Sequence, residues 1–194
     1  MKKKILEVRE LFNSFYKTTY RLWRIENKKA AKDIVGEEYE NFRKKFYEKN
    51  NVEVLTRENV LNSGINFDIV IKKNDKICII EECKASYVDS PFLKRSIFDF
   101  AVIINLCLEK NIDCPYFILS SSTKMKNFED CYKKFTKILK DEIRIIMDKK
   151  FLYLPICEHG RVKREIYFKS PENNFVLSDC LIEDQIIKIT EILK

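Results

Sequence analysis

A short apolar run, Ile77-Cys78-Ile79-Ile80, leads directly into Glu81-Glu82-Cys83-Lys84 and constrains the fold more than any other segment. The run is rich in β-branched residues and too short for a buried helix, which predicts a strand buried on both faces. A strand of this kind lies inside a sheet that helices cover on both sides. We therefore expect an α/β fold with a mixed central β-sheet flanked by helices. Because a buried run normally continues into a loop, its continuation into carboxylates and an ammonium group marks a candidate site.

Side chains alternate along a strand, so Glu82 and Lys84 should share one face while Glu81 and Cys83 share the other. Asp68 precedes Glu82 by fourteen positions (82 − 68). If Asp68 ends the neighbouring antiparallel strand, it faces the same pair, and two carboxylates and a lysine meet in one pocket. Two carboxylates suit Mg²⁺, which keeps several waters and also takes phosphate oxygens. Lys84 would then stand beside a bound water, where it can orient the water or help to deprotonate it.

Asp68 and Glu82-x-Lys84, with the hydrophobic strands around them, resemble the motif of the PD-(D/E)xK nuclease superfamily, which has the restriction-endonuclease-like fold. The family usually has Pro or a small residue before the Asp, and this chain has Phe67 there. The resemblance implies that Asp68, Glu82 and the Cys83 carbonyl bind Mg²⁺. It also implies that Lys84 helps water to attack a phosphodiester bond.

A third stretch, Gly36-Glu37-Glu38-Tyr39-Glu40-Asn41-Phe42, is similar to the opening of the family's first core helix. It implies Glu40 as a further acidic catalytic residue. With it, the resemblance covers about residues 34 to 123, in the order helix, strand, strand, strand, helix, strand. Simpler explanations stay open. Glu40 also fits an ordinary acidic first turn, and Glu82 with Lys84 fits an exposed pair on an edge strand, worth under about 1 kcal/mol.

The rest of the chain predicts further helices and strands around this core. Apolar periodicity and turn residues place these elements along the chain. We expect helices over residues 3–24, 90–110 and 179–193, along the lysine-rich stretch from 124 to 146, and around Glu40 after a break at 25–33. We expect further strands at 114–120, 151–156 and 166–168, and a turn at 170–174. The strand at 114–120 should pair beside the strand that carries Glu82.

At 194 residues the chain has room for a single domain, residues 1–194. We expect the catalytic core at about 34–123 and elements for DNA recognition or dimerisation in 124–194. The sequence has no apolar run of about eighteen residues, which argues against a membrane span. A basic N-terminus without a following apolar region, together with seven scattered cysteines and no C-x-x-C pair, predicts a cytoplasmic protein.

The 37 Lys and Arg residues outnumber the 30 Asp and Glu residues, for a net charge of +7. This excess favours a polyanionic partner, although solvated surface lysines explain it equally well. Two basic groups are candidates for contacts with DNA. They are Lys133 and Lys137 on the lysine-rich stretch, and Arg161, Lys163 and Arg164 near the only histidine, His159.

The resemblance implies a Mg²⁺-dependent endonuclease that hydrolyses double-stranded DNA. Among such nucleases, a small stand-alone chain is most similar to a type II site-specific restriction endonuclease acting as a homodimer. Two alternatives remain: a structure-directed nuclease of the Holliday-junction resolvase or repair type, and a non-catalytic nucleic-acid-binding module. The sequence has no Walker-type phosphate loop, so we expect no nucleotide cofactor.

Overall fold

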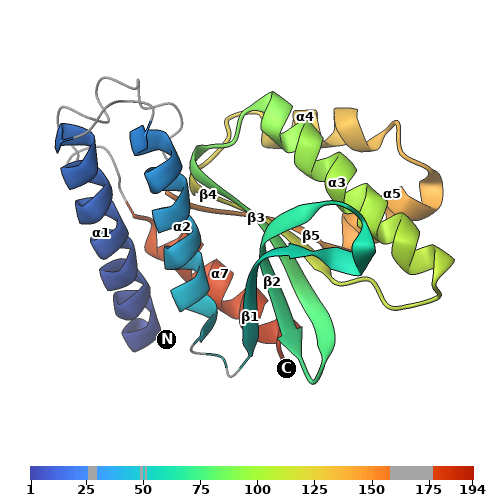
Figure 1. Ribbon diagram of the computed structural model, residues 1–194, viewed down its shortest axis with the longest axis horizontal. Coiled ribbons are helices and arrows are strands. Elements are labelled where there is room, and N and C mark those ends of the chain that lie inside the picture. Colours follow the sequence, from blue (N-terminus) through green and yellow to red (C-terminus); the bar gives the residue numbers. More distant parts are fainter. Residues whose placement is uncertain (26–29, 49, 51, 158–176) are drawn as a thin grey trace.

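The computed structural model describes residues 1–25, 30–48, 50, 52–157 and 177–194. It is α/β, with one five-stranded sheet between two layers of helices (Figure 1), as the sequence predicts. The strands are β1 (Glu53–Asn59), β2 (Asn66–Lys73), β3 (Lys76–Tyr87), β4 (Tyr116–Thr123) and β5 (Phe151–Cys157), and the helices are α1 (Lys2–Ile25), α2 (Ala30–Glu48), η1 (Val60–Asn62, one 3₁₀ turn), α3 (Ser90–Glu109), α4 (Phe128–Thr136), α5 (Asp141–Lys150) and α7 (Asp179–Ile192).

The strands follow one another across the sheet in the order of the chain, β1-β2-β3-β4-β5. The first three strands pair antiparallel, whereas β4 and β5 run parallel to β3, so the sheet is mixed. The strand of the apolar run, β3, is therefore the central strand. Its neighbours are β2, which carries Asp68, and β4, the strand expected to pair beside it.

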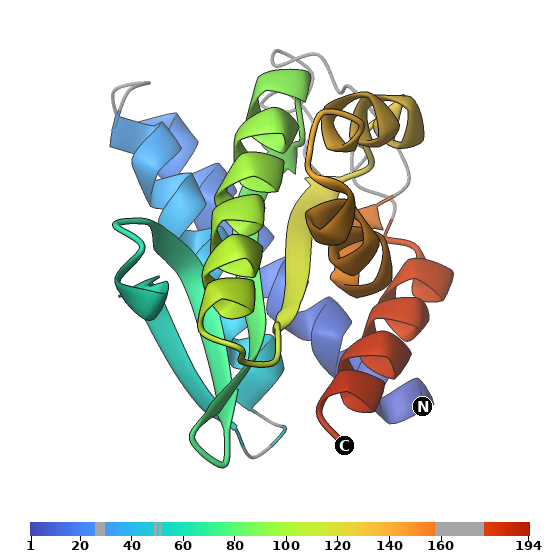
Figure 2. The same cartoon turned by 90° about the vertical axis from the view of Figure 1, so that its right-hand side faces the viewer.

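Helices cover both faces of this sheet (Figures 1 and 2). Ile79 of β3 packs into the hydrophobic core under α1, α2 and α7. Its neighbour Ile80 packs into the second core, under α3, α4 and α5. Both side chains are fully buried, which confirms that β3 is covered on its two faces.

The lysine-rich stretch is not one helix, contrary to the sequence-based prediction. It forms two helices, α4 and α5, separated by residues 137–140. Lys140 is the residue before α5 and has ψ 145°, an extended value that ends helical geometry there. Ile138, expected on the apolar face, lies in this connection with 67% of its surface exposed. Phe128 of α4 and Met147 of α5 are buried instead, so each short helix packs its own apolar side.

Ile25 lies in α1 and residues 30–33 lie in α2, so these parts of the expected break at residues 25–33 are helical, whereas 26–29 fall outside the described residues. Gly36 therefore lies inside the helix rather than at its opening. The expected strand at 166–168 and turn at 170–174 fall outside the described residues. The same holds for Arg161, Lys163, Arg164 and His159.

No helix in the described ranges is both long and apolar enough to cross a membrane. All seven cysteines are free. Cys107 and Cys157 are buried and Cys180 is exposed, whereas the remaining four are half-buried.

Candidate active site

The two faces of β3 carry the side chains that the alternation predicts. On one face, the Lys84 ammonium lies 4.4 Å from the centre of the Phe92 ring in α3. On the other, Glu81 binds Arg43 of α2 and Cys83 packs against the core under the same helix. Phe92 is held near the start of α3 because Asp89 caps the helix and accepts the Phe92 N–H at 2.9 Å.

Asp68 lies near the beginning of β2, beside Glu82. The pairing of β2 with β3 runs as far as Ile69 opposite Glu81, so one further step along the antiparallel register sets Asp68 opposite Glu82. The Cys83 main-chain N–H donates a hydrogen bond of 2.7 Å to Asp68 Oδ2, which fixes the orientation of the carboxylate. The structure thus brings together the two carboxylates that the sequence motif singles out.

Glu40 of α2 completes a group of three carboxylates, Glu40, Asp68 and Glu82, which we call the acidic cluster. Burial, together with the charges of Asp68, Asp99 and Glu40, raises the pKa of Glu82 to about 8 against the opposing charge of Arg95. Burial also raises the pKa of Glu40 to about 7, again reinforced by Asp68. The three carboxylates are therefore close enough to repel one another.

The pKa of Asp68 is also raised by burial, although the hydrogen bond from the Cys83 N–H opposes this rise. Elevated pKa values at all three carboxylates mean that their charged forms lack sufficient stabilisation from the protein. A divalent cation at this point would favour the charged forms. The protein by itself does not fully offset the free-energy cost of charging these three carboxylates.

Within the described part of the chain, no group of three or more His, Cys, Asp or Glu side chains is arranged to hold a metal ion. The expected set uses Asp68, Glu82 and the Cys83 carbonyl, and Mg²⁺ commonly completes such a small set with water and phosphate oxygens. All of these ligands are oxygens, which fits Mg²⁺ in kind. The Cys83 side chain itself faces away, with Sγ 3.6 Å from Glu81 Oε1.

Two arginines that the sequence analysis did not single out border the acidic cluster. Arg57 of β1 lies with Nη2 3.2 Å from Glu37 Oε1 and Nε 3.9 Å from Glu40 Oε2. Arg95 of α3 lowers the pKa of both Asp68 and Glu82. Neither arginine belongs to a recognisable sequence motif. The only signal is that Arg95 lies in the helix that follows the Lys84 strand.

A buried network lies behind β3, on the face opposite Glu82. Arg43 of α2 holds Glu81 through Nε to Oε1 at 2.6 Å and Nη2 to Oε2 at 3.2 Å. The Tyr47 hydroxyl donates to the same carboxylate, and Gln185 of α7 accepts from Arg43 Nη1 at 2.8 Å. Gln185 in turn donates to the Pro155 carbonyl of β5 at 2.9 Å. The network therefore joins α2, β3, β5 and α7.

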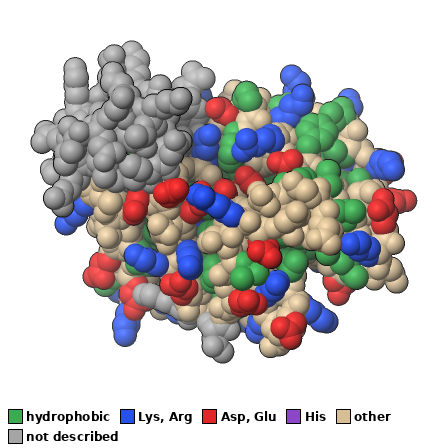
Figure 3. Space-filling model, viewed as in Figure 1, with side chains coloured by type: hydrophobic (Ala, Val, Ile, Leu, Met, Phe, Trp, Pro, Cys, Tyr) green, Lys and Arg blue, Asp and Glu red, His purple; other side chains and the backbone are tan. Residues whose placement is uncertain are grey.

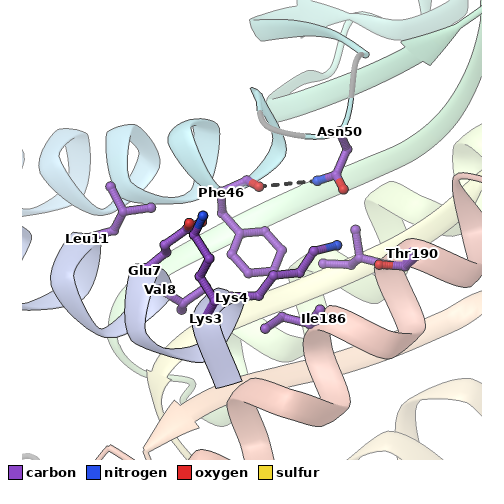
Figure 4. A pocket seen from close by; sticks show the side chains of 10 residues that line it. Lys3, Lys4, Glu7, Val8, Leu11, Phe46, Asn50, Ile186 and Thr190 are labelled. Carbon is purple, nitrogen blue, oxygen red and sulfur yellow. Dashed lines mark hydrogen bonds between the residues drawn. The ribbon is translucent and has the colours of Figure 1, made fainter. Parts of the chain in front are cut away.

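A cavity of about 300 Å³ lies elsewhere, between α1, the end of α2 and α7 (Figure 4). Phe46, Ile186 and Ile189 are among the residues that line it, and Lys3 and Lys4 come from the start of α1. No member of the acidic cluster lines it. The cavity is therefore separate from the candidate site.

Charged side chains of both signs alternate over the face in Figure 3, without a broad region of one sign among the coloured residues. Of the residues expected to contact DNA, Lys133 in the last turn of α4 and Lys137 just after it are exposed. No family model, curated protein or solved structure matches this chain.

Proposed function

We propose that the protein is a Mg²⁺-dependent endonuclease that hydrolyses phosphodiester bonds in double-stranded DNA. One observation carries the proposal. Glu82 and Lys84 share a face of β3, with Asp68 opposite Glu82 in the neighbouring strand. Carboxylates with raised pKa values, on a strand face that also carries a lysine, suit the chemistry of phosphate-ester hydrolysis with a divalent cation.

Asp68, Glu82 and the Cys83 carbonyl would hold the ion, and Glu40 would add a carboxylate from α2. When bound, Mg²⁺ would polarise the phosphate oxygens and stabilise the charge that develops on the leaving 3′ oxygen. The hydrogen bond from Cys83 N–H to Asp68 Oδ2 orients this carboxylate before any ligand arrives. Such preorganisation limits the rearrangement needed during the reaction.

Lys84 would orient the attacking water and assist the loss of its proton. Its ammonium rests on the Phe92 ring, a cation–π contact that holds the side chain near α3. The water attacks phosphorus, the bond to the 3′ oxygen breaks, and the products carry a 5′-phosphate and a 3′-hydroxyl. By its small size and its resemblance, the chain is best placed among type II restriction endonucleases that act as homodimers.

The test is incubation of the purified protein with unmethylated plasmid and phage DNA, with and without Mg²⁺. Lys84→Ala and Asp68→Asn should abolish cleavage, because the first removes the ammonium and the second removes a ligand charge. Asn can still accept the Cys83 N–H, so Asp68→Asn preserves the local hydrogen bond. Lys76→Ala is the matched control, because Lys76 is an exposed lysine at the far end of the same strand.

Discrete Mg²⁺-dependent bands that disappear in Lys84→Ala would support a site-specific restriction endonuclease. A smear, or cleavage confined to branched DNA, would leave the metal site in place but replace the restriction role with a structure-directed or nonspecific one. DNA binding without cleavage of any substrate would contradict the proposal and favour a binding module. Circular dichroism of each variant separates lost chemistry from lost folding.

A further inference from the structure

Arg57 and Arg95 approach the acidic cluster from two different elements. Arg57 belongs to β1, the strand that pairs with the Asp68 strand. Arg95 belongs to α3, and its guanidinium lies 5.1 Å from the centre of the Phe92 ring, the ring that also contacts Lys84. Arg57 lowers the pKa of Glu40 and Asp68, so each arginine acts on two members of the cluster.

The contacts that these arginines make inside the protein are weak. Both side chains are 64% exposed. Arg57 Nη2 donates a hydrogen bond of 3.2 Å to Glu37, whose side chain is itself exposed. The distances from Arg57 Nε to Glu40 Oε2 and from Arg95 Nε to Asp99 Oδ2 are 3.9 and 4.0 Å, beyond ordinary hydrogen-bond length. Exposed ion pairs contribute about 0–1 kcal/mol to stability. Folding therefore gains little from having arginine at either position.

The backbone of Arg57 adds a second observation. Its φ is 54°, in the left-handed region, and it interrupts the pairing of β1 with β2 between Thr56 opposite Ile69 and Glu58 opposite Phe67. The interruption falls opposite Asp68. A left-handed conformation costs a non-glycine residue on the order of 1–2 kcal/mol, and strain of this kind concentrates at functional sites. The strand is thus distorted where Arg57 stands beside the acidic cluster.

We infer that Arg57 and Arg95 bind the phosphate groups of the DNA backbone on either side of the bond that is cut. The inference rests on the proposed nuclease function and names the residues that hold its substrate. A guanidinium presents planar, paired N–H donors that match phosphate oxygens, and its partial exposure leaves those donors within reach of a ligand. Arg57 would exchange its contacts with Glu37 and Glu40 for a phosphate.

Charge balance explains why the site needs these two residues. The acidic cluster repels a polyanion, so a nucleic-acid backbone needs cations next to the cluster in order to approach it. Two cations at the border of the cluster attract the backbone locally and leave the carboxylates in place. Phosphate contacts of this kind position DNA without reading its sequence.

The experiment measures binding of a labelled DNA duplex to Arg57→Asn and Arg95→Ala, without metal, between about 50 and 200 mM salt. Asn adopts positive φ more readily than most residues, so the first variant removes the cation without adding backbone strain. We expect each variant to weaken binding on the order of tenfold for every duplex sequence and to reduce the slope of log affinity against log salt by about 1. Arg95→Lys should retain the slope and lose part of the affinity, because lysine keeps the charge but not the paired donors.

Arg144→Ala is the matched control, because this arginine lies on α5, is 38% exposed and pairs only with the nearby Asp141 among its described ion pairs. Its affinity and salt slope should equal those of the wild type. The inference is overturned alone if the wild type cleaves DNA, Lys84→Ala does not, and both arginine variants keep the wild-type affinity and slope. A change in the pH profile of cleavage with unchanged binding would also overturn it. If the wild type neither binds nor cleaves DNA, the proposed function falls together with the inference.

Discussion

Glu81 and Glu82 are adjacent in the chain, yet their two carboxylates have opposite electrostatic surroundings. Glu81 is fully buried, and Arg43 holds it with two hydrogen bonds. Glu82 is almost as deeply buried, but no ion pair or hydrogen bond reaches its carboxylate from the described residues, and its pKa is raised to about 8. One charge is neutralised within the fold, whereas the other lies beside two more carboxylates. The contrast separates a buried ion pair from a buried carboxylate whose charge the fold does not compensate.

Among variants that test this contrast, the largest expected effect is on the rate of DNA cleavage. Glu82→Gln keeps the size of the side chain and removes a ligand charge, so DNA cleavage should fall about 1000-fold or more, the equivalent of several kcal/mol of transition-state stabilisation. The metal-free protein should not lose stability, because Gln removes a charge that the fold does not compensate. Single-turnover cleavage and urea unfolding check the two statements. Wild-type cleavage by Glu82→Gln would contradict the assignment of Glu82 to the active site.

The next effect concerns the stability of the buried pair. Arg43→Met leaves Glu81 buried without its cation and should cost about 3–5 kcal/mol of unfolding free energy. The double variant Arg43→Met/Glu81→Leu should recover most of this loss, because neither charge remains. Urea unfolding of the two single variants and the double variant completes a double-mutant cycle. Equal losses in Arg43→Met and the double variant would show that charge pairing is not what the network supplies.

The smallest effect is the dependence of stability on pH. The folded pKa of Glu82 is about 8 and that of Glu40 about 7, both above the ordinary 4.5. Between these values the folded state keeps protons that the unfolded state has lost, so the contribution of these two carboxyls to stability is fully present below about pH 4.5 and is lost as the pH rises toward 8. Glu82 alone should account for a loss of about 3 kcal/mol between about pH 5 and pH 7.5.

Urea unfolding of the metal-free protein at several pH values measures this loss. Glu82→Gln should flatten the dependence, and Mg²⁺ should oppose it by stabilising the charged carboxylates in the folded protein. An identical pH dependence of stability in the wild type and in Glu82→Gln would show that the pKa of the Glu82 carboxylate is not raised in the folded protein. Lys76→Ala serves as the control for a change of charge elsewhere on β3.

The elements that local patterns dictate could be predicted from the sequence. The apolar run with its β-branched residues predicts β3, and strand alternation alone separates Glu81 from Glu82. The pairing of Arg43 with Glu81 could not be predicted in this way, because 38 positions separate the two residues and the sequence carries no signal for which lysine or arginine meets which carboxylate. The position of Arg57 next to the acidic cluster depends on an interruption of strand pairing that no local sequence pattern predicts.

The division of the lysine-rich stretch into α4 and α5 also escaped prediction, for a different reason. Residues 137–140 are Lys-Ile-Leu-Lys, all compatible with a helix by intrinsic propensity. Tertiary packing overrides that propensity, because Phe128 and Met147 are both buried in the core under the second helical layer. A continuous helix would also have placed Ile138 on its apolar face, whereas Ile138 is exposed.

Glu40 and Arg43 lie within a single turn of α2, the first as a member of the acidic cluster and the second bound to Glu81. Successive residues of an α-helix are rotated by about 100°, so one residue inserted between them would turn one of the two side chains away from its partner. An insertion before Gly36 would instead shift both residues together and keep their mutual spacing. We therefore expect natural variation in the length of this helix to accumulate ahead of Gly36 and to spare the turn from Glu40 to Arg43.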